Sequence, residues 1–438
     1  MQESATFELP TPLLKRLRLA DWLYAAILLF GASIALHRYG SGMDSYDTAI
    51  LFVAVPAFTW LGWMWKPMRR LLPVIGALAL LAISLYAGQL ALAEKKFLLK
   101  YFLASQPAIM WMSVLFFLAL FAYWGGLLAG ASKAAPTASW VGMALTWTAV
   151  VMGFTGLLVR WYESYLIGAD VGHIPVSNLY EVFVLFSLIT AMFYLYYEQR
   201  YATRQLGAFV LLVICAAVGF LLWYTFERGA HEIQPLVPAL QSWWMKIHVP
   251  ANFIGYGTFS LAAMVAFAYL IKQHGDSALG WKIMPLFVLG TLLGIEPLVF
   301  RKSGLPEYWM IYFAVAAFIV GGILALRQRI AASLPSLEVL DEVMYKSIAI
   351  GFAFFTIATI LGALWAADAW GTYWQWDPKE TWALIVWLNY AAWLHMRLIK
   401  GLRGNFAAYW ALVGLLVTGF AFLGVNMFLS GLHSYGEL

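Results

Sequence analysis

Cysteine is almost absent from this sequence. Of the 438 residues only Cys215 is a cysteine, and it lies within an apolar run. A single cysteine excludes an internal disulfide bond and a CxxC pair for thiol exchange. Any thiol chemistry in which the chain takes part would therefore belong to thiol-reducing proteins that are supplied separately.

Charge is also scarce. Charged residues make up 11% of the chain and hydrophobic residues 63%, and the mean hydropathy is +0.78. These values are typical of a polytopic membrane protein and exclude an ordinary soluble domain. Lysine and arginine mostly report orientation in such a protein, so the sequence pI of about 9.0 indicates no nucleic-acid partner. We expect no cleavable signal peptide, because the first apolar run follows a polar start and lacks a small-residue cleavage site after it.

Thirteen apolar runs have about the 20 residues that a bilayer requires. The sequence therefore predicts an all-α polytopic integral membrane protein with about 13 transmembrane helices. The ninth run is the weakest, because Pro285 and Glu296–Pro297 interrupt it. The runs lie near residues 19–36, 48–65, 71–92, 108–130, 140–159, 179–196, 208–226, 249–271, 283–300, 308–326, 347–364, 383–399 and 406–429.

Basic residues predict the orientation. With thirteen spans and the N-terminus inside, five basic clusters fall on the inner side, near residues 15–18, 66–70, 200–204, 327–329 and 397–403. Residues 95–100 and the Arg301–Lys302 pair are the exceptions. The C-terminus is then outside, together with the tryptophan-rich stretch 365–382.

This stretch, WAADAWGTYWQWDPKETW, is the most unusual part of the chain. It holds five tryptophans, namely Trp365, Trp370, Trp374, Trp376 and Trp382. An aromatic belt at headgroup level needs only one or two such residues per helix end. The density favours a flat platform for a large planar ligand, and haem is the first candidate. Gly371 allows close approach, and we expect Asp377 and Glu380 to hold the loop through bonds to backbone N–H groups.

Three of the seven histidines are candidate ligands of a haem iron. His248, before the eighth span, and His433, in the tail, lie on the same side as the tryptophans, and imidazole is a standard haem ligand. Their alternative role is that of interfacial residues. His395 lies within the twelfth span, where ionisable groups are rare and usually functional, although a bond to a neighbouring helix is as good an explanation. His173, in VGHIPVSNLYE, either supports the site or makes a loop hydrogen bond.

Several segments resemble a known family. WGTYWQWDPKETW resembles the tryptophan-rich signature of the haem-handling proteins of cytochrome c maturation. HIPVSNLYE, LVPALQSWWMKIHV, EVLDEVMYKSIAIGF and GVNMFLSGLHSYG resemble the CcsA/ResC branch of System II. The resemblance covers residues 160–438, whereas residues 1–150 carry no motif that we can match. Residues 276–334 look like a two-helix insertion that compact family members lack.

The resemblance implies a set of haem-binding residues. His248 and His433 match two external axial ligands. His395 matches one ligand of an intramembrane haem site whose second ligand comes from a ResB/CcsB-type membrane partner. The residues matching or flanking the signature are Trp365, Trp370, Gly371, Trp374, Trp376, Asp377, Glu380 and Trp382.

The implied function is export and presentation of haem. Haem b, a transient cargo, would cross the bacterial cytoplasmic membrane and be held on its external, periplasmic face for covalent attachment to the CxxCH segment of an apocytochrome c. Whether the chain catalyses that attachment as an enzyme, a subunit of a haem lyase, stays open. Two alternatives also stay open: a cytochrome b-like electron-transfer subunit, and a transporter of another hydrophobic cargo.

Overall fold

The computed structural model describes residues 13–277, 280–299, 306–399 and 402–431. His433 and the Arg301–Lys302 pair lie outside the described residues. The described residues form helices and loops without any strand, as the all-α prediction requires. The chain divides into two compact units, residues 1–77 and 78–438.

The first unit is built on a helical hairpin. Asp21 is buried and forms an ion pair with Arg69, and the Trp63 Nε1–H donates to the Asp21 carbonyl oxygen at 3.0 Å. Tyr24 crosses the hairpin and donates to the Phe58 carbonyl oxygen at 3.2 Å. The helices are α1 (Leu13–Arg16), α2 (Leu19–Tyr39), η1 (Gly40–Gly42), α3 (Ser45–Met64) and the first half of α4 (Met68–Tyr86).

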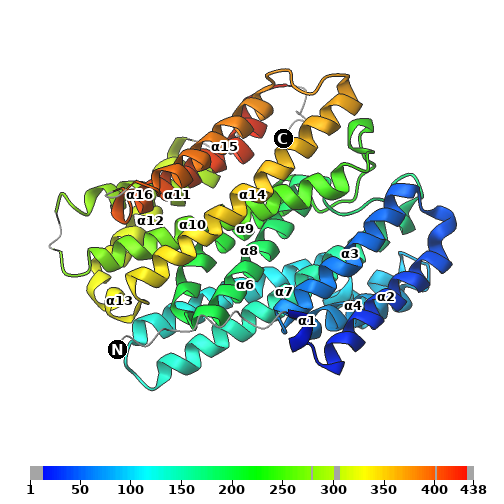
Figure 1. Cartoon of the computed structure of the whole chain (residues 1–438), viewed down its shortest axis with the longest axis horizontal. Helices are drawn as coiled ribbons and strands as arrows, with labels where there is room; N and C mark the ends of the chain where they lie inside the picture. Colours follow the sequence, from blue (N-terminus) through cyan, green and yellow to red (C-terminus); the bar gives the residue numbers. More distant parts are fainter. Residues whose placement is uncertain (1–12, 278–279, 300–305, 400–401, 432–438) are drawn as a thin grey trace, which may run out of the picture. The chain divides into compact units, whose positions relative to one another are not determined.

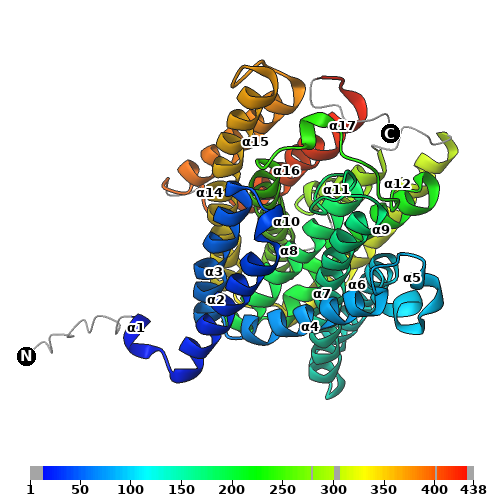
Figure 2. The ribbon, with the colours of Figure 1, turned by 90° about the vertical axis from the view of Figure 1, so that its right-hand side faces the viewer.

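The second unit holds the remaining helices (Figures 1 and 2). These are α5 (Leu92–Lys95), η2 (Leu99–Leu103), α6 (Ser105–Ala129), α7 (Ala134–Ile167), α8 (Leu179–Tyr201), η3 (Arg204–Leu206), α9 (Gly207–Arg228), η4 (Pro238–Leu240), α10 (Met245–Gln273), α11 (Met284–Val299), α12 (Pro306–Ala325), α13 (Arg327–Ser333), α14 (Leu337–Trp370), α15 (Pro378–Met396), α16 (Asn405–Gly419), η5 (Phe420–Gly424) and α17 (Val425–Phe428).

Helix α10 forms the core of this unit. Every residue from Gly255 to Ile271 is buried, and the helix packs against α8, α9, α14 and α16 (Figure 1). Small residues permit this packing, as is usual between membrane helices. A Cβ atom built on Gly255 would lie 3.1 Å from the Phe355 Cβ, and one built on Gly351 would lie 2.5 Å from the Thr258 Oγ1. The backbones of α10 and α14 therefore run unusually close together.

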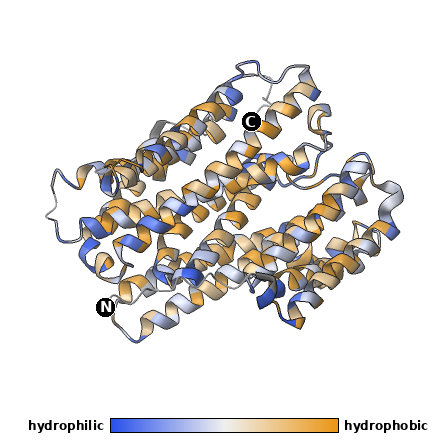
Figure 3. Ribbon diagram, viewed as in Figure 1, coloured by the Kyte–Doolittle hydropathy of each residue, from blue (hydrophilic) through white to orange (hydrophobic). Residues whose placement is uncertain are grey.

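Each of the thirteen predicted apolar runs falls on a helix. Within the described residues, ten helices are long and apolar enough to cross a membrane, and an eleventh crossing is possible if the bent pair α12–α13 counts as one span. Helix α11 has only 16 residues, and α15 includes Lys379, Glu380, Asn389 and His395. The protein is therefore a polytopic membrane protein, while the count of thirteen and the orientation stay predictions. Helix middles are predominantly hydrophobic, and hydrophilic residues gather mostly near helix ends (Figure 3).

Helix α14 is longer than its predicted apolar run, 347–364. It has 34 residues, which gives a length of about 51 Å at 1.5 Å per residue, against a hydrocarbon core of about 30 Å. Its last turns carry Trp365 and Trp370. The segment predicted as an external loop, 365–382, therefore consists of a helix end, the loop 371–377 and the start of α15.

Candidate functional site

The loop between α14 and α15 is defined by residues that stop and start helices. Helix α14 ends because Gly371 has φ +79°, a left-handed conformation that glycine adopts without strain. Asp377 caps α15, with Pro378 in its first turn. Glu380 Oε2 accepts from the backbone N–H groups of Gln375 at 2.7 Å and Asp377 at 3.2 Å, and Asp377 Oδ1 accepts from the Lys379 N–H at 2.9 Å. The expectation that these two carboxylates hold the loop is confirmed.

Trp376 is presented outward by a strained backbone. Its φ of +57° is rare for a residue with a side chain. The side chain is 68% exposed and that of Tyr373 is 64% exposed. The Trp374 and Trp376 rings meet edge to face, with centroids 5.9 Å apart. The loop thus exposes a broad aromatic surface.

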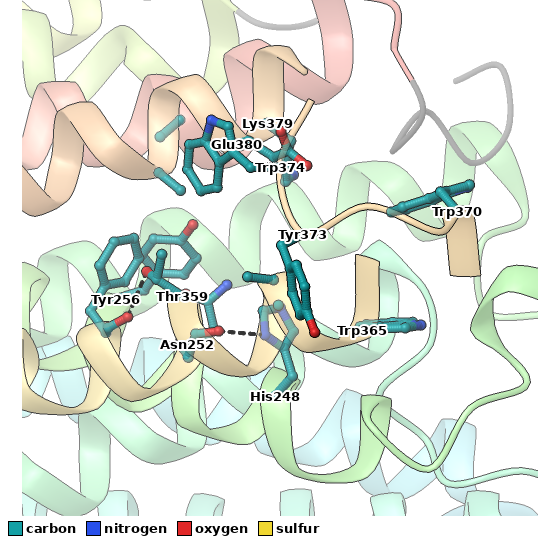
Figure 4. A pocket seen from close by; sticks show the side chains of 16 residues that line it. His248, Asn252, Tyr256, Thr359, Trp365, Trp370, Tyr373, Trp374, Lys379 and Glu380 are labelled. Carbon is teal, nitrogen blue, oxygen red and sulfur yellow. Dashed lines mark hydrogen bonds between the residues drawn. The ribbon is translucent and has the colours of Figure 1, made fainter. Parts of the chain in front are cut away.

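A cavity of about 130 Å³ lies beneath this loop, between α10, α14 and α15. In Figure 4, His248 and Asn252 point into it from one side, Trp374, Lys379 and Glu380 lie on the other, and Tyr373 stands between them. The lining residues are His248, Asn252, Tyr256, Phe355, Ala358, Thr359, Gly362, Ala363, Trp365, Trp370, Tyr373, Trp374, Lys379, Glu380, Ala383 and Ala421.

His248 is held against α14. Its Nδ1 lies 2.8 Å from the Ala358 carbonyl oxygen, which only accepts, so Nδ1 donates and carries a proton. The ring reaches α14 because residue 362 is glycine: a Cβ there would lie 2.9 Å from the His248 Cε1. The Trp365 ring packs edge to face with the imidazole at 5.6 Å.

Lys379 is an unexpected member of the site. Its Nζ donates to the Asn426 Oδ1 at 2.6 Å and lies 5.8 Å from the centroid of the Phe422 ring. Lys379 precedes the apolar part of α15. Burial lowers its pKa to about 8, while the Asp377 carboxylate acts in the opposite direction. The lysine ties the start of α15 to α17.

The described C-terminal segment also reaches the loop. A Cβ atom on Gly431 would collide with the Asp377 Oδ2 and would lie 3.0 Å from the Pro378 Cδ. The backbone at Gly431 therefore lies directly against the first residues of α15. Gly431 is two residues before His433 in the sequence.

The other two predicted histidines lie elsewhere. His395 is exposed in the last turn of α15, fifteen residues from Glu380 and so about 22 Å along the helix axis. His173 is 8% exposed. Its Nδ1–H donates to the Val171 carbonyl oxygen at 2.6 Å, and its Nε2 lies 3.0 Å from the Ser177 Oγ. Since His173 does not line the described cavity, a loop hydrogen bond describes it better than direct site support.

The structure brings together only part of the predicted set. His248, Trp365, Trp370, Trp374 and Glu380 line the cavity. Gly371, Trp376 and Asp377 shape the loop, and Trp382 packs on Phe420 with ring centroids 4.3 Å apart. Sequence reasoning missed Asn252, Tyr256, Thr359, Tyr373 and Lys379. The first two follow His248 at intervals of four residues, a spacing that places them on one helix face.

The chain matches the family model of the cytochrome C assembly protein over residues 176–433. The chain belongs to that family. Its relatives include proteins named cytochrome c biogenesis protein CcsA. That of Heterosigma akashiwo is 35% identical over 295 residues, 66% of this chain and 82% of the relative. That of Synechococcus elongatus is 34% identical over 325 residues, 72% of this chain and 93% of the relative.

This membership confirms the resemblance seen in the sequence and gives the protein a role in cytochrome c biogenesis. The matched region contains the whole cavity lining. The described part of unit 1 lies outside it. The cytochrome c assembly region is thus the region that carries the aromatic site.

Proposed function

We propose that the protein moves haem across the membrane and presents it at the aromatic loop for attachment to an apocytochrome c. The observation that carries this proposal is the His248 imidazole, which projects toward a tryptophan-lined cavity with its Nδ1 proton held by the Ala358 carbonyl (Figure 4). With Nδ1 protonated, Nε2 is the nitrogen that would bind iron.

The size of the cavity supports transient holding. Its volume of about 130 Å³ is below the roughly 300–1,000 Å³ of ordinary ligand pockets. We infer that one edge of the macrocycle enters the cavity, while its remaining surface rests on the exposed rings of Tyr373 and Trp376. A ligand held at an open aromatic surface is accessible to a second protein.

His433 is the proposed second axial ligand. It lies outside the described residues, but Gly431, two residues earlier, lies against Asp377 and Pro378. The Lys379–Asn426 bond fixes α17, which precedes Gly431, to the start of α15.

The position of His395 supports a second, inner haem site that is shared with a partner protein. Its side chain is exposed at the end of α15 opposite the cavity. If His395 binds haem iron, its outward position would let another chain supply the second ligand, and we propose a ResB/CcsB-type protein for that role. Haem b would enter near His395, on the cytoplasmic side, and leave at the external, periplasmic face.

In the proposed attachment, the thiols and the haem form the new bonds. Each thiol of the apocytochrome CxxCH segment would add across a vinyl double bond of haem, sulfur joining one carbon and hydrogen the other, so no oxidant is consumed. The protein would bind and orient the haem, and the apocytochrome histidine would then displace one of the two external ligands.

Purification with and without the partner, followed by absorption spectroscopy, tests this proposal. Substoichiometric haem with two histidine ligands is the expected result. Tight, stoichiometric and redox-active haem would instead indicate a cytochrome b-like subunit, and absence of haem in both preparations would indicate a transporter of another cargo.

A further inference from the structure

A second cavity lies within the helical bundle of unit 2. Its volume is about 570 Å³, within the roughly 300–1,000 Å³ range of small-molecule sites. Residues of α6, α8, α9, α10, α11, α12, α16 and η5 line it. Helices α11 and α12 come from segment 276–334, which the sequence marked as an insertion, so this segment contributes to a cavity rather than only to the surface.

The lining is mostly apolar and aromatic, with a few polar groups. Phe183, Phe186 and Phe267 are among its aromatic residues, and Ser260 and Thr418 carry hydroxyl groups. The Thr418 hydroxyl donates to the Gly414 carbonyl oxygen at 2.7 Å and keeps its capacity to accept. Glu296 is the one carboxylic acid among the described lining residues. An acidic side chain at such a place in a membrane protein is rare and usually functional.

Glu296 is positioned by the neighbouring helix. A Cβ atom on Gly419 would lie 2.6 Å from the Glu296 Oε2, so the carboxyl group rests on the backbone of α16. The π-helix η5 begins at the next residue, and such local widenings are frequent at functional sites. Thr418, beside it, lies 3.3 Å from the Tyr390 hydroxyl.

The charges decide which occupant fits. Among the described residues, no lysine or arginine lines this cavity. An anionic ligand such as haem, with its propionates, or a fatty acid would meet an acidic side chain without a compensating cation. A neutral molecule with carbonyl or hydroxyl oxygens would instead hydrogen-bond the carboxyl and hydroxyl groups, and a flat ring would stack on the phenylalanines.

We propose that this cavity binds a neutral, membrane-soluble molecule with a flat ring bearing carbonyl or hydroxyl oxygens and an apolar tail. Its head contacts Glu296, and its tail lies among the apolar side chains of α9 and α12. Tyr256 lines both this cavity and the cavity beneath the aromatic loop, so the occupant is one side chain away from that site.

Photolabelling tests this proposal on the full chain in lipid nanodiscs. The probe is a decyl-benzoquinone with a diazirine in its tail, and labelled peptides are located by mass spectrometry. We expect labels on α9 and α12 that unlabelled decyl-benzoquinone displaces and palmitate does not. Glu296→Leu should weaken binding by about three- to tenfold, the effect of one lost hydrogen bond, and Glu296→Gln should bind more tightly than Glu296→Leu.

Two further variants distinguish binding in the cavity from binding at the lipid-facing surface. Ala316→Trp fills the cavity and should abolish the competed labels. Leu292→Trp is the matched control on α11, at a side chain that is 38% exposed and outside the lining, and should leave them unchanged. Equal displacement by palmitate, or labels that survive Ala316→Trp, would overturn the proposal. Because the assay reads photolabels and uses no haem as probe or competitor, its result is independent of the proposed haem function.

Discussion

Replacement of His248 by glycine separates iron ligation from a purely structural role. The change removes the imidazole and leaves a ring-sized space bordered by Gly362, Ala358 and Trp365. The acceptor of the Nδ1–H bond is a backbone carbonyl and stays in place. Free imidazole that enters the space can therefore remake that hydrogen bond and supply the same nitrogen to iron.

The expected loss of bound haem follows from the bonds that His248→Gly removes. One neutral hydrogen bond contributes about 1 kcal/mol, and the ligand bond to iron contributes more. We expect His248→Gly to lower the haem that co-purifies by more than about tenfold, or about 1.4 kcal/mol. Added imidazole regains the bonds but not the tether, whose loss costs at least about 4 kcal/mol at 1 M standard state. Millimolar imidazole should therefore restore part of the haem and of the cytochrome c maturation.

The assay has two controls. His274→Gly removes an imidazole at the other end of the same helix α10 and should change neither haem content nor maturation. Trp374→Ala removes about 100 Å² of apolar contact if one indole face touches the haem, a loss of about 2.5 kcal/mol that imidazole does not restore. Normal maturation by His248→Gly, or an unchanged haem spectrum, would refute the ligand assignment.

Three further predictions follow from the same geometry. Gly362→Ala should displace the histidine ring, because the new Cβ would lie 2.9 Å from it, and should shift the haem spectrum, whereas Gly322→Ala, with nothing within 4 Å, should not. Lys379 has a folded-state pKa of about 8, below its ordinary value, so the unfolded state binds more protons above that pH. The thermal midpoint should accordingly rise between pH 8 and 10 relative to Lys379→Met, and parallel pH profiles would contradict this. Reporter fusions after Arg204 and Arg403 should read cytoplasmic and a C-terminal fusion external; a cytoplasmic C-terminus would place the tail on the wrong side for the two-ligand hypothesis.

The helices could be predicted from the sequence far better than their ends. Apolar runs of bilayer length are decided locally, and each predicted run is helical. Where a helix continues past its apolar part, local hydropathy gives no signal. Helix α14 continues to Trp370 and ends because Gly371 adopts a left-handed conformation. Helix α15 starts at Pro378, directly after the capping residue Asp377.

The residues of the site could be predicted only where they lie close together in the sequence. The tryptophans and the two loop carboxylates share a stretch of eighteen residues, so their density was visible in the sequence. Tyr256 and Thr359 lie about a hundred residues apart and meet only because α10 packs against α14. No local sequence pattern predicts such a pairing. The lowered pKa of Lys379 could not be predicted from the sequence either, because it depends on burial against Phe422 and Asn426.

The packing that stabilises the core also sets the chemistry of the site. Gly255 and Gly351 let the backbones of α10 and α14 approach in the middle of the bundle, and Gly362 continues the close contact to the aromatic end. At that end the approach is close enough for a side chain of α10 to hydrogen-bond a carbonyl of α14. The orientation of the His248 ring is therefore fixed by helix packing rather than by the loop. The loop in turn is held by the Glu380 and Asp377 carboxylates.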